Sequence, residues 1–242
     1  MTGAEMNPST GETPRLVVAV DGPSGSGKSS VSKEVARRLG AAFLDTGAMY
    51  RAVAWHCQQT GVLDDADAVV AATQDLDLAL SVDPDLERVV VGTDDITEAI
   101  RDPAVSSVVS VVATNRAVRE LLVARQREMI DTHGRIVAEG RDITTVVAPD
   151  ADARILLTAS PEARTARRSA QLGDTVGEKE LADQVAGRDA RDSAVVDFMV
   201  PADGVGLVDS TELDFGETVE AVLAEVARQQ ATQTTDPEGE RA

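Results

Sequence analysis

The sequence has few aromatic residues, a single cysteine and no long apolar run. One tryptophan, one tyrosine and three phenylalanines leave valine, alanine, leucine and isoleucine to build the core. Such a core favours buried parallel strands covered by helices over an aromatic-rich sandwich. Cys57 cannot form an internal disulfide, which fits a reducing compartment, and we interpret it as a packing residue. No apolar stretch approaches the roughly 20 residues of a membrane-spanning helix, so we expect a cytoplasmic protein with no membrane partner.

Positive charge is also scarce. The chain has 23 Lys and Arg residues against 42 Asp and Glu residues, a formal net charge of −19. Binding to long nucleic acid depends on clustered basic residues, so this partner is excluded. A small anion is not excluded, because a few local arginines and backbone N–H groups can hold it whatever the total charge.

Apolar runs alternate with helical patterns, which predicts an α/β fold with a parallel sheet. The expected strands are 16–20, 43–44, 135–138, 154–158 and a weaker one at 206–208. The expected helices are 28–39, 48–57, one amphipathic helix between 112 and 130, and a closing helix around 219–226. We expect residues 1–14 and 229–242 to be a disordered leader and a disordered tail.

The segment 63–105 interrupts this alternation. Leu76, Leu78 and Leu80 alternate with other residues, and a Val-rich run at 87–91 follows Pro84. Period-two patterns of this kind predict a small antiparallel sheet. We therefore expect a core formed by 15–62 and 106–228, with 63–105 as an inserted domain.

A glycine-rich motif follows the first expected strand and begins the first expected helix. It matches the phosphate-binding pattern G-x-x-x-x-G-K-[ST]. Its glycines let backbone N–H groups turn onto a phosphate, the lysine reaches the β- and γ-phosphates, and the serine hydroxyl that follows can bind Mg²⁺. The predicted ATP site comprises Gly22, Pro23, Ser24, Gly25, Ser26, Gly27, Lys28, Ser29 and Ser30, with Ser29 as the metal ligand.

Three further motifs follow the phosphate-binding loop. The chain contains DTGAMYR at 45–51, GRD at 140–142 and RDARDS at 188–193. Together with GPSGSGKS, their order and spacing resemble the bacterial cytidylate kinases, P-loop nucleoside monophosphate kinases, over about residues 16–228. The resemblance implies a five-stranded parallel sheet flanked by helices, a small antiparallel β insert that binds the monophosphate, and a helical lid at about 161–192. It also implies a monomer that uses ATP with Mg²⁺ to phosphorylate CMP and dCMP.

The resemblance assigns roles to residues at the matching positions. Thr46, Arg51 and Arg141 would surround the CMP phosphate, a task that suits guanidinium groups. The cytosine would be held by Ser110, Arg119 and Asp142, whose carboxylate can accept from the N4 amino group. Arg188 and Asp192 would hold the sugar hydroxyls. Lys28, the lid residues Arg164 and Arg168, and Asp45 near Mg²⁺ or the phosphates would complete the catalytic set.

Other roles are open for several of these residues. Asp142 could cap the helix after the third strand. Asp45 could be a turn residue at the end of a strand. Arg51, Arg119 and the lid arginines could be ordinary solvated side chains. The chain also departs from the family, because Val195 stands where resembling kinases have an arginine that contacts phosphate.

The reaction itself needs no general base. A CMP phosphate oxygen has a second pKa near ~6 and is largely ionised at neutral pH. Aligning two anions and neutralising their repulsion is therefore the main task of the site. Two alternatives are a small-metabolite kinase of the shikimate or gluconate type, which would want a carboxylate base, and a non-catalytic nucleotide-binding protein.

Overall fold

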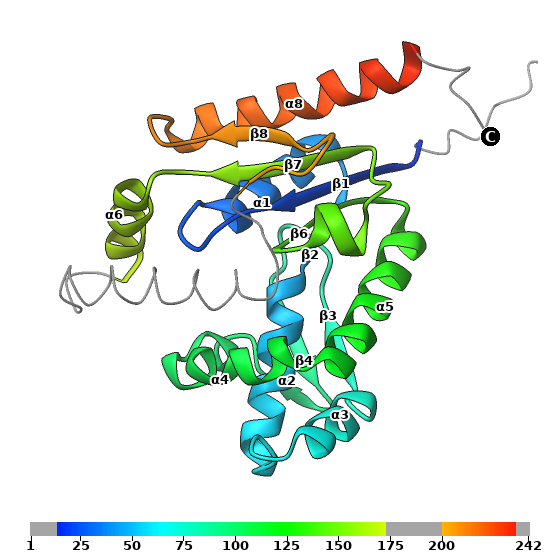
Figure 1. Ribbon diagram of the computed structural model, residues 1–242, viewed down its shortest axis with the longest axis vertical. Coiled ribbons are helices and arrows are strands. Elements are labelled where there is room, and N and C mark those ends of the chain that lie inside the picture. The colour runs from blue at the N-terminus through cyan, green and yellow to red at the C-terminus, as the bar shows by residue number, and fades with distance from the viewer. Residues whose placement is uncertain (1–13, 173–199, 236–242) are drawn as a thin grey trace, which may run out of the picture.

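The larger part of the molecule is built on a five-stranded sheet in the order β2-β6-β1-β7-β8, in the upper half of Figure 1. The computed structural model describes residues 14–172 and 200–235. Every neighbouring pair of strands in this sheet is parallel, which confirms the predicted fold class. The strands are β1 (Leu16–Asp21), β2 (Ala42–Asp45), β6 (Arg135–Gly140), β7 (Ala153–Thr158) and β8 (Gly206–Asp209).

The central strand β1 is buried on both faces. Val17 and Ala19 pack into one apolar cluster, while Val18 and Val20 pack into another, as alternation along a strand requires. The helices α1 (Lys28–Leu39) and α8 (Phe215–Thr235) cover the second face, and α5 (Arg116–His133) contacts β6 on the first. The phosphate-binding loop and the GRD motif thus both begin at the carboxyl end of a buried strand.

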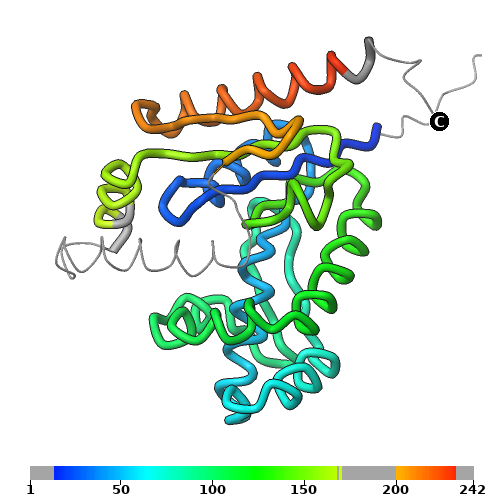
Figure 2. The backbone as a smooth tube through the Cα atoms, in the orientation of Figure 1, coloured from blue at the N-terminus to red at the C-terminus, as the bar shows by residue number. Residues whose placement is uncertain are grey.

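A second, smaller part of the molecule contains the predicted antiparallel sheet, shown below the main sheet in Figure 2. Its strands are β3 (Leu78–Leu80), β4 (Val89–Val91) and β5 (Asp94–Asp95), and β4 pairs with both others. The surrounding helices are α2 (Thr46–Thr60), α3 (Ala66–Gln74), η1 (Ala99–Arg101) and α4 (Pro103–Thr114). Since α2 and α4 pack on each other and on η1, helices outside 63–105 also belong to this part. The proposed division of the chain into domains stays a prediction.

Some elements differ from the sequence expectation. The helix expected between 112 and 130 is α5, which begins at Arg116 because Asn115 ends α4 and its side chain caps α5 through the amides of Ala117 and Val118. The helix α3 and the short π-helix η2 (Ile143–Val147) were not predicted. The helix α6 (Pro161–Leu172) begins at the expected proline.

The disordered tail expected from residue 229 was wrong for its first seven residues, since α8 continues to Thr235. The amide side chain of Gln229 explains the extension. It accepts from the backbone N of Arg154 at 2.9 Å and donates to the carbonyl of the same residue at 2.9 Å, which fixes this turn of α8 to β7. Among the described residues, no helix is both long enough and apolar enough to cross a bilayer.

Candidate active site

The phosphate-binding loop connects β1 to α1 as the motif predicted. Gly25 and Gly27 have φ angles of 79° and 85°, a region that side chains other than glycine rarely adopt. A Cβ at Gly22 would lie 2.2 Å from the carbonyl oxygen of Leu157 on β7. Glycine is therefore required sterically at these positions. Of the predicted ATP-site residues, Ser30 is exposed in the first turn of α1, and the others form the loop and the start of the helix.

Two arginines of α6 hold the loop from outside. Arg164 is only 5% exposed and donates to the carbonyl oxygens of Ala159 and Ser24, at 3.2 and 3.1 Å. Arg167, which the sequence reasoning missed, donates to the carbonyl oxygen of Ser26 at 3.2 Å. A solvated arginine was thus the wrong interpretation for Arg164. The side chain of Arg168, and all of Arg188, Asp192 and Val195, lie outside the described residues.

Glu139 is the main site residue that the sequence reasoning missed. It is the last residue but one of strand β6, is 2% exposed, and accepts a hydrogen bond from Ser29 Oγ to its Oε1 at 2.6 Å. Its Oε2 lies 3.7 Å from Lys28 Nζ and has no hydrogen-bond partner among the described residues. Burial raises the pKa of Glu139 and lowers the pKa of Lys28. The available signal was one acidic residue in the apolar strand RIVAEG.

Asp45 and Arg51 form an ion pair at the start of α2. Asp45 Oδ1 accepts from the backbone N of Ala48 at 2.9 Å, which makes Asp45 the cap of this helix, and Oδ2 lies 2.9 Å from Arg51 Nη2. Burial alone would raise the pKa of Asp45. The charges of Arg51 and Lys28 and the amide of Ala48 outweigh it and hold the pKa below its usual value. The sequence left open that Asp45 is a turn residue at the end of a strand, and the structure shows that it ends β2 and caps α2. Its ion pair shows that Arg51 is not an ordinary solvated arginine.

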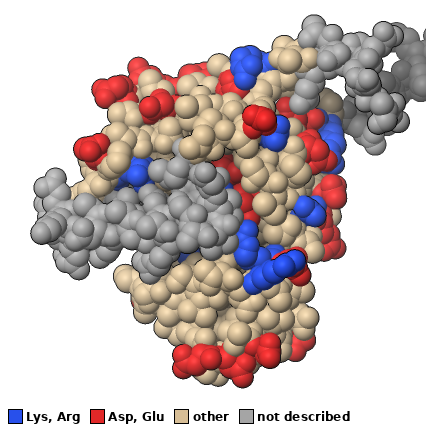
Figure 3. Space-filling model, viewed as in Figure 1, with Lys and Arg blue, Asp and Glu red and all other residues tan. Residues whose placement is uncertain are grey.

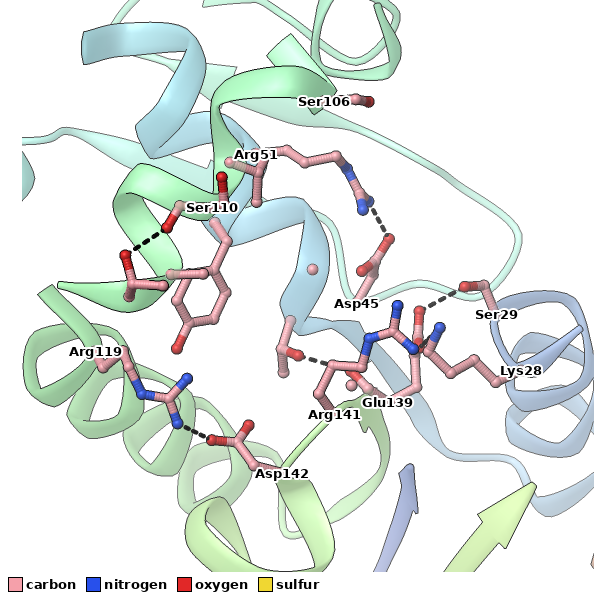
Figure 4. Close-up of a pocket in the computed structure, with 17 residues that line it drawn as sticks. Lys28, Ser29, Asp45, Arg51, Ser106, Ser110, Arg119, Glu139, Arg141 and Asp142 are labelled. Atoms are coloured by element: carbon pink, nitrogen blue, oxygen red, sulfur yellow. Dashed lines mark hydrogen bonds and ion pairs between the residues drawn. The ribbon is translucent and has the colours of Figure 1, made fainter. Parts of the chain in front are cut away.

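A pocket extends from the phosphate-binding loop along α2, α4 and α5. Figure 4 shows Lys28, Arg51 and Arg141 at one end and Arg119 with Asp142 at the other. The structure thus brings together every predicted acceptor residue that it describes. The residues that line the pocket are Lys28, Ser29, Asp45, Thr46, Gly47, Tyr50, Arg51, Ser106, Val109, Ser110, Ala113, Thr114, Arg119, Glu139, Gly140, Arg141 and Asp142.

The far end of the pocket is defined by a second ion pair. Arg119 Nη2 of α5 lies 2.5 Å from Asp142 Oδ2, and Asp142 is 5% exposed. The expectation that Asp142 could cap the following helix was wrong, since its side chain makes no capping hydrogen bond. Arg119 is not an ordinary solvated arginine either. Burial raises the pKa of the nearby Tyr50 to about 12, so its hydroxyl stays protonated.

The near end concentrates positive charge beside the loop. Arg141 Nη1 donates to the carbonyl oxygen of Gly22 at 2.5 Å, which connects the GRD motif to the loop. The buried hydroxyl of Thr46 donates to the carbonyl oxygen of Glu139 at 2.8 Å. In Figure 3 basic side chains gather midway along this face, whereas acidic ones crowd its lower end. A small anion would therefore find its counter-charges between the two parts of the molecule.

Comparison with known proteins agrees with this geometry. The model of the cytidylate kinase family matches residues 18–228. The cytidylate kinase of Cutibacterium acnes (strain DSM 16379 / KPA171202) is 49% identical over 214 residues, covering 87% of this chain and 96% of that protein. The cytidylate kinase of Rhodococcus opacus (strain B4) is 50% identical over 221 residues, covering 89% of this chain and 96% of that protein.

Among solved structures, a gluconokinase from Sinorhizobium meliloti 1021 has a TM-score of 0.52 at 16% identity, covering 93% of this chain and 98% of that one. At so low an identity this likeness concerns the fold alone. The family match extends over most of the chain and includes the phosphate-binding loop and both ion pairs of the pocket. The chain belongs to the cytidylate kinase family.

Proposed function

We propose that the protein transfers the γ-phosphoryl group of ATP to CMP and dCMP, giving ADP and the pyrimidine nucleoside diphosphate. The single observation that carries this proposal is the shape of one pocket. Its near end holds the phosphate-binding Lys28 and its far end holds the Arg119–Asp142 pair. A nucleoside monophosphate has the same two ends, an anionic phosphate and a hydrogen-bonding base.

ATP occupies the loop, with its phosphates on the backbone N–H groups and on Lys28. Mg²⁺ fits beside Ser29, because a hydroxyl and the buried carboxylate of Glu139 are the hard oxygen donors this ion prefers, and Oε2 of Glu139 accepts no hydrogen bond from the described residues. Few protein ligands are needed, since Mg²⁺ usually keeps waters and substrate phosphates in its shell. When bound, the ion neutralises charge that develops on the transferring phosphoryl group.

The CMP phosphate lies between Thr46, Arg51 and Arg141. In the structure Arg51 is already oriented by Asp45 at 2.9 Å, so its guanidinium needs little reordering to bind phosphate oxygens. Asp45 acts in this proposal through Arg51 and Lys28, whose charges it balances. An ionised CMP oxygen attacks the γ-phosphorus, and the bond to the ADP oxygen breaks. No proton has to be removed for this step.

The base lies at the far end against Ser110, Arg119 and Asp142. The carboxylate accepts from the N4 amino group of cytosine, whereas uracil presents a carbonyl oxygen there. Arg119 keeps this carboxylate in place through its 2.5 Å contact. Arg164, Arg168, Arg188 and Asp192 keep their proposed roles in the lid and at the sugar. The expected form is a monomer, by the family resemblance, and the cytoplasm stays the location expected from the sequence.

The experiment is a coupled assay of ADP release with ATP and Mg²⁺, comparing CMP, dCMP, UMP, AMP, shikimate and gluconate. CMP and dCMP should give the highest kcat/KM. The Lys28→Ala variant serves as the control, because ADP release that survives it comes from a contaminant. Faster turnover of shikimate or gluconate would refute the proposal, and no turnover of any acceptor would favour the non-catalytic alternative.

A further inference from the structure

Asp21 is a buried carboxylate that the proposed reaction leaves without a role. It is the last residue of the central strand β1 and is 3% exposed. Its Oδ1 accepts from the backbone N of Ile143 at 2.8 Å. Its Oδ2 accepts from the backbone N of Thr144 at 2.9 Å and from Thr144 Oγ1 at 2.5 Å. Burial raises the pKa of Asp21, and these three donors act against the rise.

The group that Asp21 holds is the segment directly after Asp142. Residues Ile143–Val147 form a single π-helical turn, an element that is rare and weak on its own. Its own hydrogen bonds include two that share one acceptor, the carbonyl oxygen of Asp142, from Val146 N at 2.8 Å and Val147 N at 3.1 Å. The carboxylate of Asp21 supplies the acceptors for the first amides of this turn, a task that Asp142 itself does not perform.

This connection lies between the two substrate sites. Asp21 immediately precedes Gly22 of the ATP loop, and Gly22 accepts from Arg141 at 2.5 Å. On the other side, Asp142 is fixed at its carboxylate by Arg119 and at the following backbone by Asp21. Together, Arg119 and Asp21 determine the direction in which the short side chain of Asp142 points. Displacing either anchor would move the carboxylate that faces the base.

We propose that Asp21 is a positioning residue for the acceptor nucleotide, which acts through Thr144 to aim Asp142 at the base. The inference rests on the proposed function, because it assumes that Asp142 contacts the cytosine. It assigns to Asp21 a part in the choice between cytosine and uracil, although its side chain touches neither nucleotide. The loop that binds ATP and the turn that selects the acceptor are thereby held by one side chain.

The deciding variant is Thr144→Val, which keeps the size of the side chain and removes the hydroxyl donor. Losing one hydrogen bond to a charged group should raise the KM for CMP about tenfold. The selectivity for CMP over UMP should fall by a similar factor, while the KM for ATP stays within about twofold. Thr144→Ser retains the hydroxyl, so its KM for CMP and its selectivity for CMP over UMP should be close to those of the wild type. The exposed neighbour provides the matched control, Thr145→Val, which should behave like the wild type.

Asp21→Asn is the more severe variant, because its amide places an N–H group against at least one backbone N–H. It should lose more selectivity than Thr144→Val, and a failure to fold leaves the decision to Thr144→Val. Thermal unfolding of each variant shows whether a kinetic loss follows a loss of folded protein. Equal losses for CMP, UMP and ATP, or a Thr144→Val enzyme identical to Thr145→Val, would overturn the inference. A wild-type protein that releases no ADP with CMP would instead refute the proposed function.

Discussion

Replacing Asp142 by asparagine tests the pocket most directly. The substitution keeps the shape of the side chain and removes its negative charge. Two hydrogen bonds are affected, one from Arg119 at 2.5 Å and one from the cytosine amino group in the proposed complex. Since Asp142 is 5% exposed, water cannot readily replace either partner.

The magnitude follows from the difference between charged and neutral hydrogen bonds. A hydrogen bond to a charged group contributes about 1.5–3 kcal/mol and a neutral one about 0.5–1.5 kcal/mol. The amide therefore costs about 1 kcal/mol at the base and about 1 kcal/mol through the looser Arg119. A total of about 2 kcal/mol lowers kcat/KM for CMP about 30-fold. For UMP no loss is expected, because the amide can donate to the carbonyl oxygen of uracil.

The assay measures ADP release with CMP and with UMP at saturating ATP, and ATP binding separately by calorimetry. The selectivity for CMP over UMP should fall by at least about 30-fold, with the ATP affinity unchanged. Urea unfolding should show a loss smaller than the roughly 3–5 kcal/mol of a fully buried broken pair, since the side chain of Arg119 is 21% exposed. Equal losses with CMP, UMP and ATP would show that Asp142 is only structural.

Three other predictions follow from the site and the core. Arg51→Lys replaces a planar fork by a point charge beside Asp45, so the KM for CMP should rise about tenfold with the KM for ATP unchanged; equal changes in both would contradict the assignment. Gly22→Ala places a Cβ 2.2 Å from the carbonyl oxygen of Leu157. It should lower the free energy of unfolding measured in urea by about 1–3 kcal/mol, and it should also weaken ATP binding. Burial raises the pKa of the Cys57 thiol, so the native thiol should react with a disulfide reagent far more slowly than the thiol in urea. Because the thiol of the unfolded chain ionises first, the free energy of unfolding should fall as the pH rises from the ordinary cysteine pKa toward the raised pKa of the folded protein. Rapid labelling of the native protein would contradict the burial.

The parts of the fold that were predicted correctly are encoded locally. The loop from Gly22 to Ser29 lies within one stretch of sequence, and the spacing of its glycines and lysine predicts the conformation of the loop. The alternating leucines of the insert likewise predicted strand β3. The helix α4 was missed because its sequence, PAVSSVVSVVAT, is rich in valine, which favours strands. Capping by Asp102 and packing against α2 outweigh this preference.

The missed site residues depend on pairing across long stretches of chain. Glu139 meets Ser29 only because β6 lies beside β1 in the sheet. The interpretation of Asp142 as a helix cap was reasonable from its position, but the cap comes from Asp21 in another strand. The sequence motifs therefore named many of the residues that line the pocket, whereas the contacts of Glu139 depend on the order of the strands in the sheet.

The order of strands in the main sheet also has a consequence for how the chain is made. Strand β1 precedes the other described strands, yet its two neighbours begin at residues 135 and 153. A ribosome must therefore deliver most of the polypeptide before this valine-rich segment can pair. Such non-local topologies fold slowly, and their unpaired strands are prone to aggregate or to be captured by chaperones. The strand that carries the catalytic loop is exposed longest during synthesis.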